Sequence, residues 1–207
     1  MTVAFVGPFS RFFAKRGTEP ARLRAGVEAW REDLRAAVAT KVAEQLQWDE
    51  GSDVAVEVDL ADGGWLAVRL FAFYAERSEL ELPDDTPPLL EFDSHWREAA
   101  DRKFEKSHFG QLLACSVWLP GDFPVTVRAP LPNGDTAEFG SIDLLAEQLK
   151  RLNQRTFAAD LDELASWRDL PAPAGGPLLD GARRGLAALS AAAATAQRFG
   201  LPIAVRV

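Results

Sequence analysis

The 207-residue sequence predicts an α+β fold, with a largely antiparallel β-sheet of about five or six strands packed against several helices. Alternating apolar and polar residues mark strands, and turn signals of the hairpin type separate several of them. Apolar residues at helical spacing mark helices between these strands. From the first long helix onward, the expected order of elements is α, β, β, α, β, β, β, α, α, β.

The N-terminal quarter predicts a short strand and one long helix. Residues 2–6 form the strand, and Phe9, Phe12 and Phe13 follow it beside basic residues. These phenylalanines suit either an aromatic and basic anchor for a membrane surface or partner, or attachment of this segment to the core, which we favour. Thr18 is the expected N-cap of the helix and Gly51 its end. The apolar face of this helix comprises Leu23, Val27, Trp30, Leu34, Val38, Val42 and Leu46.

The next quarter predicts a pair of strands, an irregular connection and a helix. Apolar and polar residues alternate over 53–60, which predicts a half-buried strand. Residues 61–64 (Ala-Asp-Gly-Gly) predict a hairpin turn after it. Residues 65–74 are apolar on both faces, which predicts a central strand. Three prolines exclude regular structure in the acidic stretch 76–93. A helix over 93–109 is expected to begin at Asp93 or Ser94.

The second half predicts three strands and several helices. The strands span residues 111–119, 123–131 and 136–140. In the second of them Val125, Val127 and Ala129 are expected to point inward. Asn133-Gly134 predicts the turn before the third strand. Ser141 is expected to cap a helix to about 157, and a short helix or turn follows at 160–170. The alanine-rich segment 178–199 predicts a helix that ends at Gly200, and residues 203–207 predict a terminal strand at a sheet edge.

The domain boundaries follow from one candidate linker. Residues 171–177 (Pro-Ala-Pro-Ala-Gly-Gly-Pro) are the best linker in the chain, which gives a main α+β domain over 1–170. Residues 178–207 are then a C-terminal helix and strand that pack on the main domain or on a partner chain.

The acidic charge is concentrated in one block. The formal net charge is −8, with +3 over residues 1–48, −12 over 49–101 and +1 over 102–207. Nucleic acid is therefore an unlikely partner, because binding phosphates requires a basic surface. No apolar run is long enough for a membrane span, and one cysteine, Cys115, allows no internal disulfide. We expect a cytoplasmic protein of bacterial type, with no membrane association.

The sequence predicts no catalytic residue, metal site or cofactor. His95 and His108 are the only histidines. Thirteen residues apart on one helix, they would point to different sides, about 140° apart. No Gly-x-Ser-x-Gly motif or phosphate-binding loop is present. Cys115 lies in an apolar segment, where a thiol is usually buried and inert.

Three function hypotheses remain, and the first is a non-catalytic protein-binding module for a partner with a basic surface. By analogy of type, without a shared motif, it would be an acidic protein of the immunity or inhibitor kind. The predicted partner-binding residues are Glu76, Glu79, Glu81, Asp84, Asp85, Leu80, Leu82 and Phe92. The alternatives are a structural subunit of a homo-oligomer, with a homodimer through 178–199, and a small-ligand protein or enzyme that uses His95 and His108. The acidic stretch also fits a solvated connection with no partner.

Overall fold

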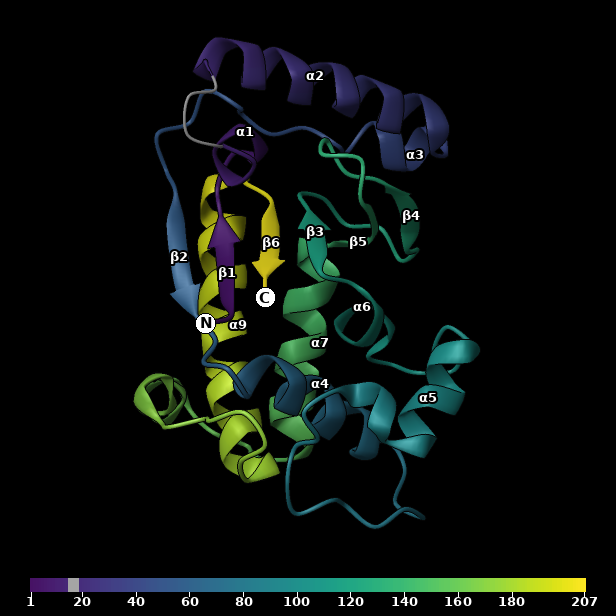
Figure 1. The fold of residues 1–207 in the computed structure, drawn as a ribbon, viewed down its shortest axis with the longest axis vertical. Helices are drawn as coiled ribbons and strands as arrows, with labels where there is room; N and C mark the ends of the chain where they lie inside the picture. The colour runs from purple at the N-terminus through teal and green to yellow at the C-terminus, as the bar shows by residue number, and fades with distance from the viewer. Residues whose placement is uncertain (15–18) are drawn as a thin grey trace.

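The computed structural model describes residues 1–14 and 19–207 and confirms the α+β fold, with a six-stranded, mostly antiparallel sheet (Figure 1). The strand order is β2-β1-β6-β3-β5-β4, and only β3 and β5 are parallel. The strands are β1 (Val3–Val6), β2 (Val56–Asp59), β3 (Val117–Leu119), β4 (Val127–Pro130), β5 (Thr136–Ser141) and β6 (Ile203–Arg206).

Helices occupy both faces of the sheet and one end of it. The α-helices are α1 (Phe9–Phe12), α2 (Pro20–Ala37), α3 (Thr40–Ala43), α4 (Gly64–Tyr74), α5 (Ser94–Asp101), α6 (Gly110–Ala114), α7 (Ile142–Arg155), α8 (Leu161–Ser166) and α9 (Leu178–Phe199). Two 3₁₀ turns, η1 (Leu90–Phe92) and η2 (Trp167–Asp169), complete the described structure. None of the described helices combines the length and the apolar character that crossing a bilayer demands.

Two hydrophobic cores lie on opposite faces of the sheet. Along β3, Trp118 faces the core that contains α4, α7 and α9, while Val117 and Leu119 face the core that contains α1, α2 and α3. This alternation follows from the two-residue period of a strand. The molecule therefore has three layers, with α7 and α9 behind the sheet in Figure 1.

Several local predictions are confirmed by the structure. Asp93 caps α5 by accepting a hydrogen bond from the Trp96 amide, and Ser141 caps α7 by accepting one from the Leu144 amide. Gly200 ends α9 in the left-handed conformation. The turn at Asn133-Gly134 joins β4 to antiparallel β5. Phe9 is fully buried against Trp30 and Trp48, as expected of a core residue.

The prediction of a central strand at 65–74 was wrong, because this segment is the buried helix α4. Gly63 and Gly64 do not form a hairpin turn: residues 60–62 follow β2, Gly63 is the N-cap of α4, and Gly64 is its first residue. An apolar run without alternation fits a buried helix as well as a buried strand. Helix α9 approaches Gly64 through Gly185, where an added Cβ would lie 2.2 Å from the Gly64 carbonyl oxygen.

The long first helix was also predicted wrongly, because it breaks at Val38. Val38 is extended, and α3 turns back so that Arg35 Nε donates a hydrogen bond to the Ala43 carbonyl at 3.1 Å. The break directs Val42 and Leu46 into the core shared with Leu34. The expected N-cap, Thr18, lies outside the described residues, as do Lys15 and Arg16, two of the basic residues beside the N-terminal phenylalanines.

Three further boundaries differ from the prediction. Helix α5 ends at Asp101, because Lys103 and Phe104 adopt left-handed backbone conformations with φ of 53° and 52°. The first half of the predicted strand 111–119 is α6. Val125 precedes β4 and is 49% exposed, so it does not point inward.

The terminal strand β6 is central in the sheet, between β1 and β3, and not at an edge as predicted. Its residues Ile203 and Ala204 are buried, which explains why Ile-Ala-Val is apolar. The small residues of α9 face α4 within the same chain, with Gly181 and Gly185 at the crossing. That face of the 178–199 helix is therefore occupied internally.

Candidate functional site

The acidic stretch 76–93 is an ordered connection between α4 and α5, and it runs along the lower edge of the molecule in Figure 1. As predicted, it contains no regular helix or strand beyond the short turn η1. The Thr86 amide donates a hydrogen bond to the Gly176 carbonyl at 2.9 Å, and the Leu178 amide donates one to the Asp84 carbonyl at 2.8 Å. Its backbone is thus held against residues 176–178.

Both ends of this stretch are anchored by carboxylates. The Tyr74 hydroxyl donates a hydrogen bond to Asp93 Oδ2 at 2.7 Å, and Asp93 Oδ1 accepts one from the Trp96 amide at 2.8 Å. Burial raises the pKa of Tyr74, and the hydrogen bond to Asp93 raises it further. Glu76 accepts hydrogen bonds from the Ser107 hydroxyl and the His108 amide. These contacts fix the two points between which the loop is exposed.

The predicted partner-binding residues divide into exposed and internal groups. Glu79, Glu81, Asp84 and Asp85 are exposed, as are Leu82 at 36% and Phe92 at 68%. Two of the eight face inward instead. The Glu76 side chain is only 10% exposed, and Leu80 packs against the main core. Leu89, at 55% exposure, and the exposed carboxylate Glu91 lie on the same stretch.

A shallow depression of about 400 Å³ lies on the acidic stretch. Its walls are the rings of Pro83, Pro87, Pro88 and Phe92. The acidic residues Asp85 and Asp93 also line it, and the Asp93 carboxylate is already hydrogen-bonded to Tyr74 and the Trp96 amide. It therefore combines apolar walls with negative charge, a combination that suits the aliphatic stem and charged head of a lysine or arginine side chain.

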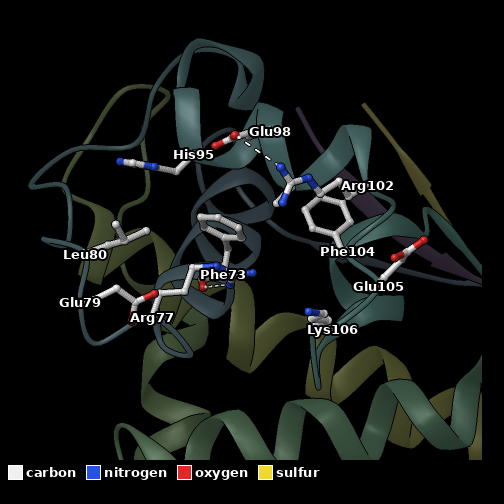
Figure 2. A pocket seen from close by; sticks show the side chains of 11 residues that line it. Phe73, Arg77, Glu79, Leu80, His95, Glu98, Arg102, Phe104, Glu105 and Lys106 are labelled. Carbon is white, nitrogen blue, oxygen red and sulfur yellow. Dashed lines mark hydrogen bonds and ion pairs between the residues drawn. The ribbon is translucent and has the colours of Figure 1, made fainter.

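A second pocket of about 350 Å³ lies where the acidic stretch meets α5 (Figure 2). Its lining includes the rings of Phe73 and Phe104. The buried Trp96 ring packs against both of them, with its centroid 5.7 Å from that of Phe73 and 4.9 Å from that of Phe104. The guanidinium of Arg77 covers the Phe73 ring at 3.8 Å. Figure 2 shows Phe73 and Phe104 facing each other across the pocket.

The charges of this second pocket cancel one another. Its three cations are Arg77, Arg102 and Lys106, and its three carboxylates are Glu79, Glu98 and Glu105. Arg102 lies 3.7 Å from Glu98 in an exposed ion pair. With this balance the pocket favours neither anions nor cations by charge alone.

The two histidines do not form a joint site. His95 is exposed on α5 at the rim of the pocket and projects outward in Figure 2, while His108 lies beyond the end of α5 and is also exposed. Within residues 1–14 and 19–207, no group of three or more His, Cys, Asp or Glu side chains is arranged to hold a metal ion.

Cys115 is fully buried, as expected of a structural thiol. Burial raises its pKa, with the charge of Glu138 adding to the effect and that of Arg69 opposing it. A thiol in this environment stays protonated at neutral pH and is a poor nucleophile.

The cationic and aromatic residues around the acidic stretch were missed in the sequence. Phe73, Phe104, Arg102 and Lys106 come from elements whose type or end was predicted wrongly. Arg69 carried the one usable signal, because it is the lone charge in the apolar segment 65–74. A lone charge in a buried segment needs a specific partner.

Comparison with known proteins gives no further identification: the chain matches no family model, no curated protein and no solved structure.

Proposed function

We propose that this protein is a non-catalytic protein-binding module that recognises a basic partner through the exposed face of residues 79–92. One observation carries the proposal: this acidic segment is ordered by internal hydrogen bonds and yet leaves apolar side chains exposed. Leu82, Leu89 and Phe92 place exposed apolar side chains among the carboxylates, where they can act as anchors for a partner. A preordered loop loses little conformational entropy on binding.

The charge of this face supports a basic partner. Five exposed carboxylates belong to it, namely Glu79, Glu81, Asp84, Asp85 and Glu91. Clustered charge of one sign speeds encounter with a complementary surface and disfavours partners of the same sign. The depression beside Asp85 and Phe92 offers a place for one basic side chain of the partner.

The proposal is tested by affinity capture from the native cell over a series of salt concentrations. A specific basic partner should be retained in stoichiometric amounts at low salt and lost as salt rises, since salt screens exposed charges. The triple charge reversal Glu81→Lys, Asp84→Lys and Asp85→Lys should abolish its capture.

A matched control separates this site from a general effect of net charge. The triple reversal Glu28→Lys, Asp33→Lys and Glu44→Lys changes exposed carboxylates on α2 and after α3 by the same total charge. Capture should survive in this control. Equal loss in both triple variants would mean that net charge, and not the acidic face, retains the partner.

A further inference from the structure

A third cleft, of about 460 Å³, lies between the β4–β5 hairpin and the helices α4, α5 and α6. Arg69 of α4 reaches it from the interior, while Lys103 and Arg128 line it from the turn after α5 and from the edge strand β4. Three cations from elements far apart in the sequence thus line one cleft.

Arg69 is held in place by its neighbours. It donates hydrogen bonds from Nε and Nη2 to the Leu113 carbonyl, at the end of α6. Its guanidinium lies 4.6 Å from the Trp65 ring centroid and 5.2 Å from that of Trp96. Two rings and a carbonyl therefore fix the plane of the guanidinium, and because Nε and Nη2 both donate to Leu113, the Nη1 end of the group is the part left to meet a carboxylate.

This cation has no counter-ion of its own among the described residues. No described carboxylate forms an ion pair with Arg69, and burial lowers its pKa to about 10, while Cys115 and Glu91 act in the opposite direction. Since a partly buried charge is unfavourable unless it is compensated, an anion in the cleft would be stabilised.

The remaining residues of the cleft narrow the choice of ligand. Glu91 and Glu138 also line it, so its three cations and two carboxylates leave an excess of one positive charge. One anionic group satisfies that excess, whereas a polyanion would be repelled by the two carboxylates. Trp96, Phe104 and Leu113 provide apolar walls for the rest of the ligand.

Two residues with a left-handed backbone conformation also lie at this cleft. Lys103 and Phe104 both line the cleft, and both adopt the left-handed conformation that residues with a side chain rarely take. The Lys103 amide donates a hydrogen bond to the Ala100 carbonyl at 2.8 Å and the Phe104 amide donates one to the Ala99 carbonyl at 3.0 Å, the pattern by which a Schellman motif ends a helix. The motif turns the chain at the point where the Lys103 side chain enters the lining.

We propose that this cleft binds a small apolar monocarboxylate, with its carboxylate on the Arg69 guanidinium and its apolar body against Trp96 and Phe104. Lys103 and Arg128 add positive potential at its sides. This inference is independent of the protein-binding proposal, because the cleft and the exposed acidic face share only Glu91.

The test uses benzoate as the probe, with the indole N–H resonance of Trp96 followed by NMR and assigned through a Trp96→Phe variant. Benzoate should shift this resonance with a dissociation constant of about 1 mM or below. Benzamide, which has the same ring but no charge, and acetate, which has the charge but no ring, should each bind about tenfold more weakly or not at all.

Three variants locate the site. Arg69→Gln should weaken benzoate binding about tenfold or more, but it also removes contacts that hold α6. Lys103→Gly removes a cation and relieves the left-handed strain, so it should weaken binding about threefold without loss of folding. Arg128→Gln should act similarly, and Arg97→Gln, an exposed change on α5 outside the cleft, should have no effect.

The outcomes decide between the proposal and its alternatives. No shift of the Trp96 resonance up to about 10 mM benzoate would overturn it. Equal binding of benzamide would show an apolar cavity without anion recognition. Unchanged binding in both Lys103→Gly and Arg128→Gln would place the ligand elsewhere.

Discussion

The crossing of α4 and α9 makes a sharp prediction, because the two helix backbones meet at Gly64 and Gly185. A Cβ at position 185 would lie 2.2 Å from the Gly64 oxygen and 2.9 Å from the Gly64 carbonyl carbon. These are backbone atoms within a helix, so the contact is relieved only if the two helices move apart. Gly185→Ala is therefore expected to destabilise the fold.

The magnitude follows from two opposing effects. Overpacking of a tight core costs about 1–3 kcal/mol, and contact with backbone places this site at the upper end. Replacing glycine by alanine inside a helix returns about 1 kcal/mol. The free energy of unfolding should thus fall by about 2 kcal/mol, which lowers the urea midpoint with little change in the slope.

Gly26 provides the matched control. It lies inside α2, is exposed, and an added Cβ would meet no atom within 4 Å. Gly26→Ala should therefore raise the free energy of unfolding by about 0.5–1 kcal/mol. The same chemical change thus has opposite signs at the two sites. Equal stabilisation by both substitutions would refute the close crossing of α4 and α9.

Three further predictions concern single side chains. Glu50 is 4% exposed and accepts hydrogen bonds from two amides of α1 and from the indole of Trp48. Glu50→Gln should lower the free energy of unfolding, measured with urea, by about 2–3 kcal/mol. The matched control Glu44→Gln, at an exposed position, should lower it by less than about 0.5 kcal/mol. Asp93→Ala removes the N-cap of α5 and the hydrogen-bond partner of Tyr74. It should lower the free energy of unfolding by about 1–2 kcal/mol and speed proteolysis within residues 76–93. An unchanged rate of proteolysis would contradict the anchoring of this stretch by Asp93. Because folding raises the pKa of Cys115, the unfolded thiol loses its proton first, near pH 9.0, and the free energy of unfolding should fall as pH rises above that value. Cys115→Ala should lack this contribution to the pH dependence. If Cys115→Ala and the unchanged protein show the same dependence of stability on pH, the thiol makes no such contribution.

Local signals in the sequence were sufficient wherever one residue decides the structure. Ser141 and Asp93 were predicted as N-caps because their side-chain oxygens accept hydrogen bonds from free amides at a helix start. Gly200 was predicted to end a helix because a residue without a side chain readily adopts the left-handed conformation. The Asn133-Gly134 turn was predicted for the same reason. These features depend on neighbours within a few residues, so the rest of the fold does not change them.

Elements that depend on distant contacts were not predictable from local pattern. Residues 65–74 form a helix because α9 presents glycines to them from 110 or more residues away in the chain. Strand β6 is central because β1 and β3 pair on both of its edges. In the candidate sites, the exposed acids were predictable from composition, whereas the aromatic and cationic walls require the tertiary fold.

Glu91 connects the two proposed sites and allows them to be tested together. It is an exposed carboxylate of the acidic face, and it also lines the Arg69 cleft. Glu91→Gln raises the excess positive charge of the cleft from one to two, so benzoate should bind about two- to threefold more tightly. The same change removes one of five charges from the acidic face, so capture of a basic partner should become weaker.

The opposite directions of these two effects make the substitution informative. A loss of folding would weaken both interactions, so only intact sites give tighter benzoate binding together with weaker partner capture. Glu79→Gln is the matched control, because Glu79 belongs to the acidic face but does not line the cleft. It should weaken capture and leave benzoate binding unchanged. Weaker benzoate binding in Glu91→Gln would show that this carboxylate supports the ligand, and would contradict the charge balance proposed for the cleft.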